Sequence, residues 1–209
     1  MNENSHIIPP SRPPAAFTSS SLDKGLRYAG FWQRFGAYWI DVLCLLPLVG
    51  ITLWLNGKHK SFTYYLFIPN QIISLWFQVY LVKKYGGTPG NLMLGIRIAR
   101  LDGSPVGYRE AILRYSVLFA LTALMSIPVL LATWRMSDAD YYSLGFLARN
   151  AKIVAGAPSW YGLINTLLNI WIWSEFIVML TNKRRRSLQD FMAGTIVIRS
   201  PKARATYTE

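Results

Sequence analysis

The chain alternates between long apolar runs and shorter segments that are rich in charged residues. Four runs are long enough to cross the hydrocarbon core of a bilayer, which takes about 20 helical residues. They span residues 35–56, 62–82, 115–134 and 160–181. Membrane helices tolerate prolines such as Pro47, Pro69 and Pro128, which fall inside the first three runs. The pattern predicts an all-α membrane protein with four transmembrane helices.

Two segments outside these runs alternate apolar and polar residues with the period of a strand. Residues 95–101 do so after a glycine-rich turn at residues 86–90, and residues 194–199 do so after the fourth run. Asp102-Gly103 is a typical hairpin turn, but an isolated hairpin is marginally stable. We therefore expect 95–101 and 194–199 to pair in a small cytoplasmic β-sheet.

Charge orients the predicted helices. The chain carries a net charge of +12, and seventeen Lys and Arg residues lie in segments 1–34, 83–114 and 182–209, against five in 57–61 and 135–159. The positive-inside rule places both termini in the cytoplasm and predicts a multi-pass protein of the cell (inner) membrane. The basic segments would lie against anionic lipid headgroups. No soluble domain presents a basic face, so we expect no nucleic acid partner.

The chain divides into three parts. Residues 1–26 are polar and rich in Pro and Ser, which predicts a disordered cytoplasmic tail, residues 27–199 form the membrane domain, and residues 200–209 form a basic tail. Cys44 is the only cysteine, and the two histidines, His6 and His59, lie apart. We therefore expect no disulfide, metal or cofactor, and no enzymatic activity.

Charged residues at the membrane are the best functional candidates. Arg34 and Asp41 are seven residues apart, so they project from one face of the first helix, about 10 Å apart along its axis. An acid near the centre of a span costs roughly 3 kcal/mol on insertion scales. In the predicted topology, Glu175 lies at a depth similar to that of Asp41, and Asp190 follows the fourth run by nine residues. An intramembrane charge is a functional-site hypothesis by default.

Two interpretations of these four residues remain open. In the first, Asp41 or Glu175 binds a cation or exchanges a proton in a polar vestibule that opens to the cytoplasm. In the second, Arg34 pairs with Asp41 or Asp190 in a structural clamp that holds the C-terminal segment under the first helix. Removing one partner of a buried ion pair typically costs ~3–5 kcal/mol, so a clamp would be essential without any chemistry.

Amides form the other polar group within the runs. Asn165 and Asn169 are four residues apart and share a helix face. We expect them to make hydrogen bonds between helices, which are worth around 0.6 kcal/mol each in membranes.

Three segments together resemble the RDD family of small multi-pass membrane proteins. They are FWQRFGAYWIDVL, GGTPGNLMLGIRIARLDGSPVGYREAILR and RRRSLQDFMAGTIVI, in this order. The resemblance identifies Arg34, Asp41 and Asp190 as the Arg and two Asp of the family name. It does not extend to Asn91, where the family often has Lys, or to Gln189, where it often has His.

The resemblance implies two functions from different classes. One is transport of a cation or small polar solute through the Arg/Asp cluster, by a homo-oligomer, because four helices enclose little volume. The other is a non-catalytic scaffold or accessory subunit that binds a membrane protein partner.

Overall fold

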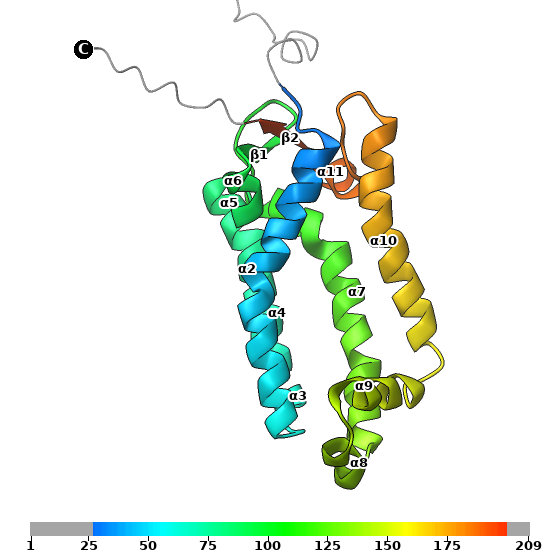
Figure 1. Cartoon of the computed structure of the whole chain (residues 1–209). Helices are drawn as coiled ribbons and strands as arrows, with labels where there is room; N and C mark the ends of the chain where they lie inside the picture. The colour runs from blue at the N-terminus through cyan, green and yellow to red at the C-terminus, as the bar shows by residue number, and fades with distance from the viewer. Residues whose placement is uncertain (1–26, 200–209) are drawn as a thin grey trace, which may run out of the picture.

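The computed structural model describes residues 27–199, and this part of the chain is mostly helical. Four helical segments within it are long and apolar enough to cross a membrane, which confirms the prediction of four spans. These segments are Phe31–Lys58, Phe62–Met93, Tyr108–Arg135 and Tyr161–Thr181. Figure 1 shows a small sheet at one end of these segments and two short helices at the other. The predicted tails, residues 1–26 and 200–209, lie outside the described residues.

The first and third spans begin earlier than their apolar runs. Helix α2 comprises Phe31–Lys58 and helix α7 comprises Tyr108–Arg135. Gly30 precedes α2, and its N–H donates to Oε1 of Gln33 at 3.2 Å. Gly107 precedes α7, and its N–H donates to Oε2 of Glu110 at 2.8 Å. These side chains satisfy backbone groups at the helix starts, so amphipathic first turns extend both helices towards the sheet.

The second span is divided, although its sequence predicts one continuous run. Its successive elements are α3 (Phe62–Tyr65), α4 (Phe67–Leu75), the π-helix η1 (Trp76–Tyr80) and α5 (Leu81–Tyr85). Helix α5 ends at Gly86, whose φ of 79° is a left-handed conformation that glycine adopts without strain. Thr88 then occupies the N-cap position of the short helix α6 (Pro89–Met93). Single π-helical turns occur frequently at functional sites.

The predicted strands pair, which confirms the small sheet. Strand β1 (Ile96–Arg100) runs antiparallel to β2 (Thr195–Arg199), with Ile98 opposite Val197. After the turn at Asp102-Gly103 the chain forms a single β-bridge, between Ala99 and Pro105, and not a further strand. A second single bridge, between Tyr28 and Ile198, adds the segment before α2 to the other edge.

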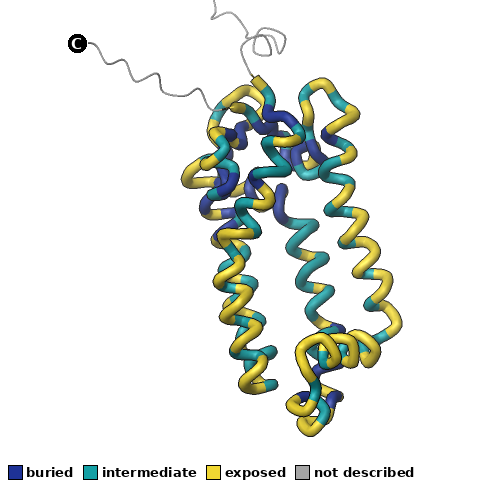
Figure 2. The backbone as a smooth tube through the Cα atoms, in the orientation of Figure 1, coloured by how far each residue is buried: buried dark blue, intermediate teal, exposed yellow. Residues whose placement is uncertain are grey.

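The tightly packed part of the molecule lies at the sheet end (Figure 2). Its apolar core combines the inward side chains of both strands with small residues from the nearby helix ends. The core residues are Ala29, Ala37, Val79, Val82, Ile96, Ile98, Val106, Ala111, Tyr115 and Val197. Farther along the spans most side chains are exposed or half-buried, as expected for helices that face lipid.

Short helices complete both ends of the molecule. The 135–159 segment, which the sequence predicts only as an external loop, contains α8 (Asp138–Ser143) and α9 (Phe146–Ala155). The fourth span is α10 (Tyr161–Thr181), and α11 (Leu188–Ala193) connects it to β2. Helix α11 contacts α7, α10 and β2. It therefore lies where three parts of the fold meet.

Candidate functional site

Asp190 is the centre of a polar cluster at the sheet end. It is the third residue of α11, and its side chain is completely buried. Its Oδ2 accepts hydrogen bonds from the N–H of Ser187 at 3.0 Å and from the hydroxyl of Ser187 at 3.1 Å. Ser187 is the N-cap of α11, so Asp190 completes a capping box. Local hydrogen bonds therefore hold the carboxylate in addition to its partners from distant elements.

Two arginines from different spans converge on this carboxylate. Nη1 of Arg34, on α2, donates to Oδ2 of Asp190 at 2.7 Å, and Nη1 of Arg114, on α7, donates to Oδ1. Arg114 also donates to Oγ1 of Thr195 at 2.6 Å, and this hydroxyl donates to Oδ1 of Asp190 at 3.1 Å. The cluster thus joins α2, α7, α11 and β2. We call Arg34, Arg114, Asp190 and Thr195 the arginine–aspartate cluster.

The environment of Asp190 stabilises its ionised form. Burial alone would raise the pKa of this carboxyl group. The positive charges of Arg114 and Arg34 outweigh burial, together with the hydrogen bonds from Ser187 and Arg34, and they hold the pKa well below its usual range. A fifth residue closes the cluster, because Arg186 donates to the carbonyl of Asp190 at 2.8 Å and to that of Thr195 at 3.1 Å.

Asp41 has partners other than Arg34. Its Oδ2 accepts from Oγ1 of Thr88 at 2.6 Å, and its Oδ1 accepts from the N–H of Gly90 at 2.8 Å. Asp41 therefore holds the start of α6 against α2. A Cβ at Gly90 would overlap the carbonyl oxygen of Ala37, so only glycine permits this approach. Of the two pairings predicted for Arg34, the structure contains the one with Asp190.

Glu175, on α10, lies beside the arginine–aspartate cluster. Its Oε1 accepts from the N–H of Gln189 at 3.1 Å. Its Oε2 is buried and makes no hydrogen bond to any described residue. The same holds for Nε and Nη2 of Arg34, although Nη1 of Arg34 binds Asp190. Buried polar groups without partners are rare in proteins, so each needs an explanation.

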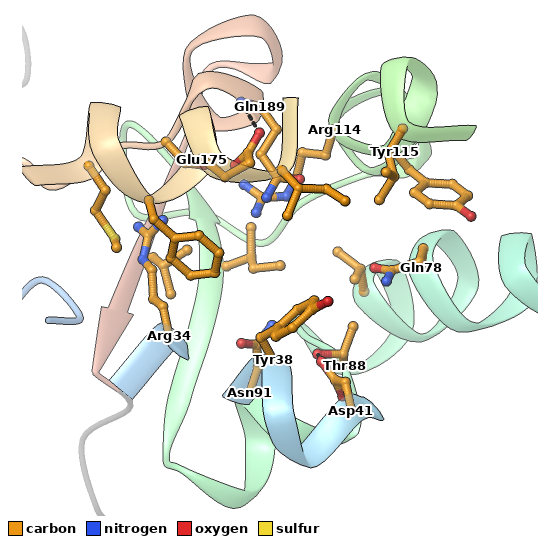
Figure 3. Close-up of a pocket in the computed structure, with 18 of the residues that line it drawn as sticks. Arg34, Tyr38, Asp41, Gln78, Thr88, Asn91, Arg114, Tyr115, Glu175 and Gln189 are labelled. Atoms are coloured by element: carbon orange, nitrogen blue, oxygen red, sulfur yellow. Dashed lines mark hydrogen bonds between the residues drawn. The ribbon is translucent and has the colours of Figure 1, made fainter. Parts of the chain in front are cut away.

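Arg34 and Glu175, which carry these unpartnered groups, both line one cavity of about 200 Å³. Figure 3 shows Glu175, Gln189 and Arg114 on one side of it, and Asp41, Thr88 and Asn91 on the opposite side. Arg34, Tyr38, Gln78 and Tyr115 complete the polar part of the lining. Gln78 comes from η1, so the π-helical turn contributes to the wall. The volume corresponds to about seven water molecules, or to one small solute.

Sequence reasoning placed Arg34, Asp41, Glu175 and Asp190 near one another, but it missed Arg114. Arg114 stands directly before the third apolar run, where it contributed to the prediction only as one of the Lys and Arg residues that orient the helices. In the structure it is the seventh residue of α7, with a side chain that is only 9% exposed. The available signal was its position as the trailing arginine of the second RDD-like segment.

The cluster does not have the composition of a metal centre. Within residues 27–199, no group of three or more His, Cys, Asp or Glu side chains is arranged to hold a metal ion. Asp41 and Asp190 each accept hydrogen bonds at both oxygens from the protein itself. The arrangement can bind a small polar molecule, because Arg34, which has unpartnered donors, and Glu175, which has an unpartnered acceptor, line one cavity.

Comparison with known proteins identifies the family. The RDD family model matches residues 28–194, a range that contains all four candidate spans, both aspartates and both arginines of the site. No curated protein and no solved structure matches the chain. The chain belongs to the RDD family, and it is a membrane protein with four candidate membrane-spanning helices.

Proposed function

We propose that this protein transports a small polar solute and binds it in the cavity between Arg34 and Glu175. One observation carries the proposal. Nε and Nη2 of Arg34 and Oε2 of Glu175 are buried and lack partners among the described residues, and both residues line the same cavity. Leaving buried polar groups unsatisfied costs about 1–3 kcal/mol each, and more for charged groups. A bound solute that offers an acceptor to Arg34 and a donor to Glu175 removes that cost.

The size and the charges of the cavity narrow the class of solute. Pockets for drug-sized ligands measure roughly 300–1,000 Å³, so about 200 Å³ suits a smaller molecule. Arg34 and Arg114 border the cavity together with Asp41 and Glu175, so its lining carries charges of both signs and does not single out a bare ion. The proposed solute is therefore neutral or zwitterionic, which narrows the sequence-based expectation of a cation or polar solute.

In this proposal the sheet end faces the cytoplasm, as the distribution of Lys and Arg predicts. A cysteine-labelling map tests the orientation in a Cys44→Ala background. We expect Asn150→Cys, on α9, to react with an impermeant maleimide from outside intact cells. Arg97→Cys, on β1, should react only after the membrane is opened. The reverse pattern would contradict the proposed orientation.

Uptake into proteoliposomes tests the proposed transport. The probes are glycine for a zwitterion, glycerol for a neutral solute, acetate for an anion and Rb⁺ for a cation. We expect protein-dependent uptake of glycine or glycerol and none of Rb⁺. Glu175→Gln should reduce that uptake by roughly tenfold or more, because hydrogen bonds to charged groups contribute about 1.5–3 kcal/mol. Glu110→Gln is the matched control, since Glu110 caps α7 outside the cavity.

A second candidate function has its own support. Asp41 and Asp190, the two aspartates of the family name, both accept hydrogen bonds from other residues of the protein at each carboxylate oxygen. Such structural roles are expected for a membrane scaffold or accessory subunit without transport. Under this alternative, no probe enters faster than in protein-free vesicles. Crosslinking in native membranes should then recover the protein with one partner protein in a fixed ratio.

A further inference from the structure

Helix α10 carries a polar face that points away from the rest of the molecule. Gly162, Asn165, Thr166, Asn169 and Trp173 recur at spacings of three and four residues, so they lie along one helix face. All five are exposed. The expectation that Asn165 and Asn169 bind neighbouring helices is wrong within the described chain. Their hydrogen bonds stay in α10, with Nδ2 of Asn169 donating to the carbonyl of Asn165 at 2.8 Å.

The depth of this face makes its polarity costly. Asn169 is the ninth of the 21 residues of α10, so it lies about 12 Å along a helix of roughly 30 Å. This position is close to the middle of the hydrocarbon core. Oδ1 of Asn169 and Nδ2 of Asn165 make no hydrogen bond to any described residue. Lipid tails cannot supply one, so a polar partner is needed inside the membrane.

The chemistry of this face matches a second copy of the same face. We propose that Gly162, Asn165, Thr166, Asn169 and Trp173 of α10 pack against the same residues of another copy of this chain. In a two-fold dimer each residue meets its own face, and an asparagine amide both donates and accepts, so the pairs satisfy one another.

Shape supports the same conclusion. Gly162 and Thr166 are small residues four positions apart, a pattern that lets two membrane helices approach closely. No atom lies within 4 Å of a Cβ built at Gly162, so nothing in the described chain blocks the approach. Beside the small residues, a shallow groove is lined by Asn165, Asn169, Ile170, Trp173 and Ile177. Trp173 is 62% exposed and supplies a large surface to bury.

The interface is separate from the proposed solute cavity. Glu175 lies six residues after Asn169, which places it about 120° around the helix. Neither Asn165 nor Asn169 lines that cavity. Dimerisation through α10 therefore leaves both cavities intact, and either proposal can fail without the other.

Disulfide crosslinking tests the interface directly. In a Cys44→Ala background, Asn169→Cys should form a covalent dimer in vesicles that contain only the purified protein. Leu46→Cys, at a residue of α2 that is 50% exposed, is the control and should remain monomeric. Equal crosslinking at both positions, or none at Asn169→Cys, would overturn the proposal.

Energy transfer between labelled copies measures the contribution of the asparagines. Diluting the protein into lipid gives its dimerisation constant. The double variant Asn165→Leu/Asn169→Leu should weaken dimerisation by roughly fivefold or more, since each interhelical hydrogen bond contributes around 0.6 kcal/mol. Asn70→Leu removes an intramembrane amide from α4 and should leave the constant unchanged. Unchanged dimerisation in the double variant would refute the proposal, as would a protein that stays monomeric at every dilution.

Discussion

Replacing Asp190 with asparagine removes one negative charge and leaves the number of non-hydrogen atoms in the side chain unchanged. Five hydrogen-bond donors converge on the carboxylate: Arg34, Arg114, the N–H and hydroxyl of Ser187, and Thr195. Asparagine keeps one acceptor oxygen and turns an NH₂ group towards the remaining donors. Two guanidinium groups then lie together with no carboxylate between them. We therefore expect Asp190→Asn to weaken the junction of α2, α7, α11 and β2.

The expected loss of stability follows from the burial of the pair. The side chains of Asp190, Arg114 and Arg34 are 0%, 9% and 11% exposed, so solvent screens them little. Removing one partner of a buried ion pair costs about 3–5 kcal/mol. For a chain of this length, each kcal/mol lowers Tm by about 2–4 °C. Asp190→Asn should therefore lower Tm by roughly 6–20 °C.

Thermal unfolding in nanodiscs, followed by the fluorescence of the eight tryptophans, measures this loss. The matched control is Asp138→Asn. Asp138 pairs with Lys60 at 3.1 Å, but its side chain is 78% exposed. Exposed pairs contribute about 0–1 kcal/mol, so the control should change Tm by at most a few degrees. Equal shifts in the two variants would refute the reasoning from burial.

The low pKa of Asp190 adds a pH signature. Its folded-state pKa lies below the unfolded value of about 3.9, so the stabilisation is complete above that value and falls as the pH drops below it. The wild-type protein should lose stability between about pH 4 and pH 2, and Asp190→Asn should lose less over the same range. Parallel pH profiles for the two proteins would show that another group controls acid unfolding.

Three further outcomes follow from the contact between α2 and α6. Gly90→Ala should lower the free energy of unfolding by about 1–3 kcal/mol, because the new methyl group overlaps the carbonyl of Ala37. The control is Gly50→Ala, whose methyl group meets open space and should leave stability unchanged or raise it in the same unfolding assay. Asp41→Ala should lower Tm by roughly 2–12 °C, because it leaves the N–H of Gly90 without its hydrogen-bond acceptor. Thr88→Val combined with Asp41→Ala should cost less than the sum of the single losses, and full additivity would show that the two side chains are not coupled.

The sequence predicted the elements of the fold better than their ends. Apolar runs reveal spans because a bilayer fixes their length, and alternation reveals strands, so both were found. The apolar runs begin after the starts of α2 and α7, because the first turns of both helices are amphipathic. The sequence indicates residues 108–114 as an amphipathic lead into the third helix, and the structure includes them in α7. The break at Leu66 and the π-helix Trp76–Tyr80 leave the apolar pattern unchanged, so hydropathy cannot detect them.

The choice of Asp190 over Asp41 as the partner of Arg34 has a physical cause. A spacing of seven residues places Arg34 and Asp41 on one face, but helical side chains lean towards the N-terminus of their helix. Arg34 therefore extends away from Asp41, towards the sheet end where Asp190 lies buried. Asp41 leans over the preceding turn, where Gly90 contacts Ala37. Two residues on one helix face are expected to lie near each other along the helix axis. The direction in which each side chain leans then decides which residues it contacts.

The formal charges around the cavity lead to one further test of the transport proposal. Arg34 and Arg114 contribute two positive charges, and Asp190 and Glu175 contribute two negative charges, so this side of the cavity is balanced. Asp41 lies at the opposite wall, and its oxygens bind Thr88 and Gly90. Glu175→Gln leaves one positive charge unbalanced beside the unpartnered nitrogens of Arg34. The variant should therefore prefer acetate over glycine in the uptake assay, reversing the wild-type order. An unchanged order would mean that Glu175 does not contact the solute, whereas no uptake by either protein would refute transport itself.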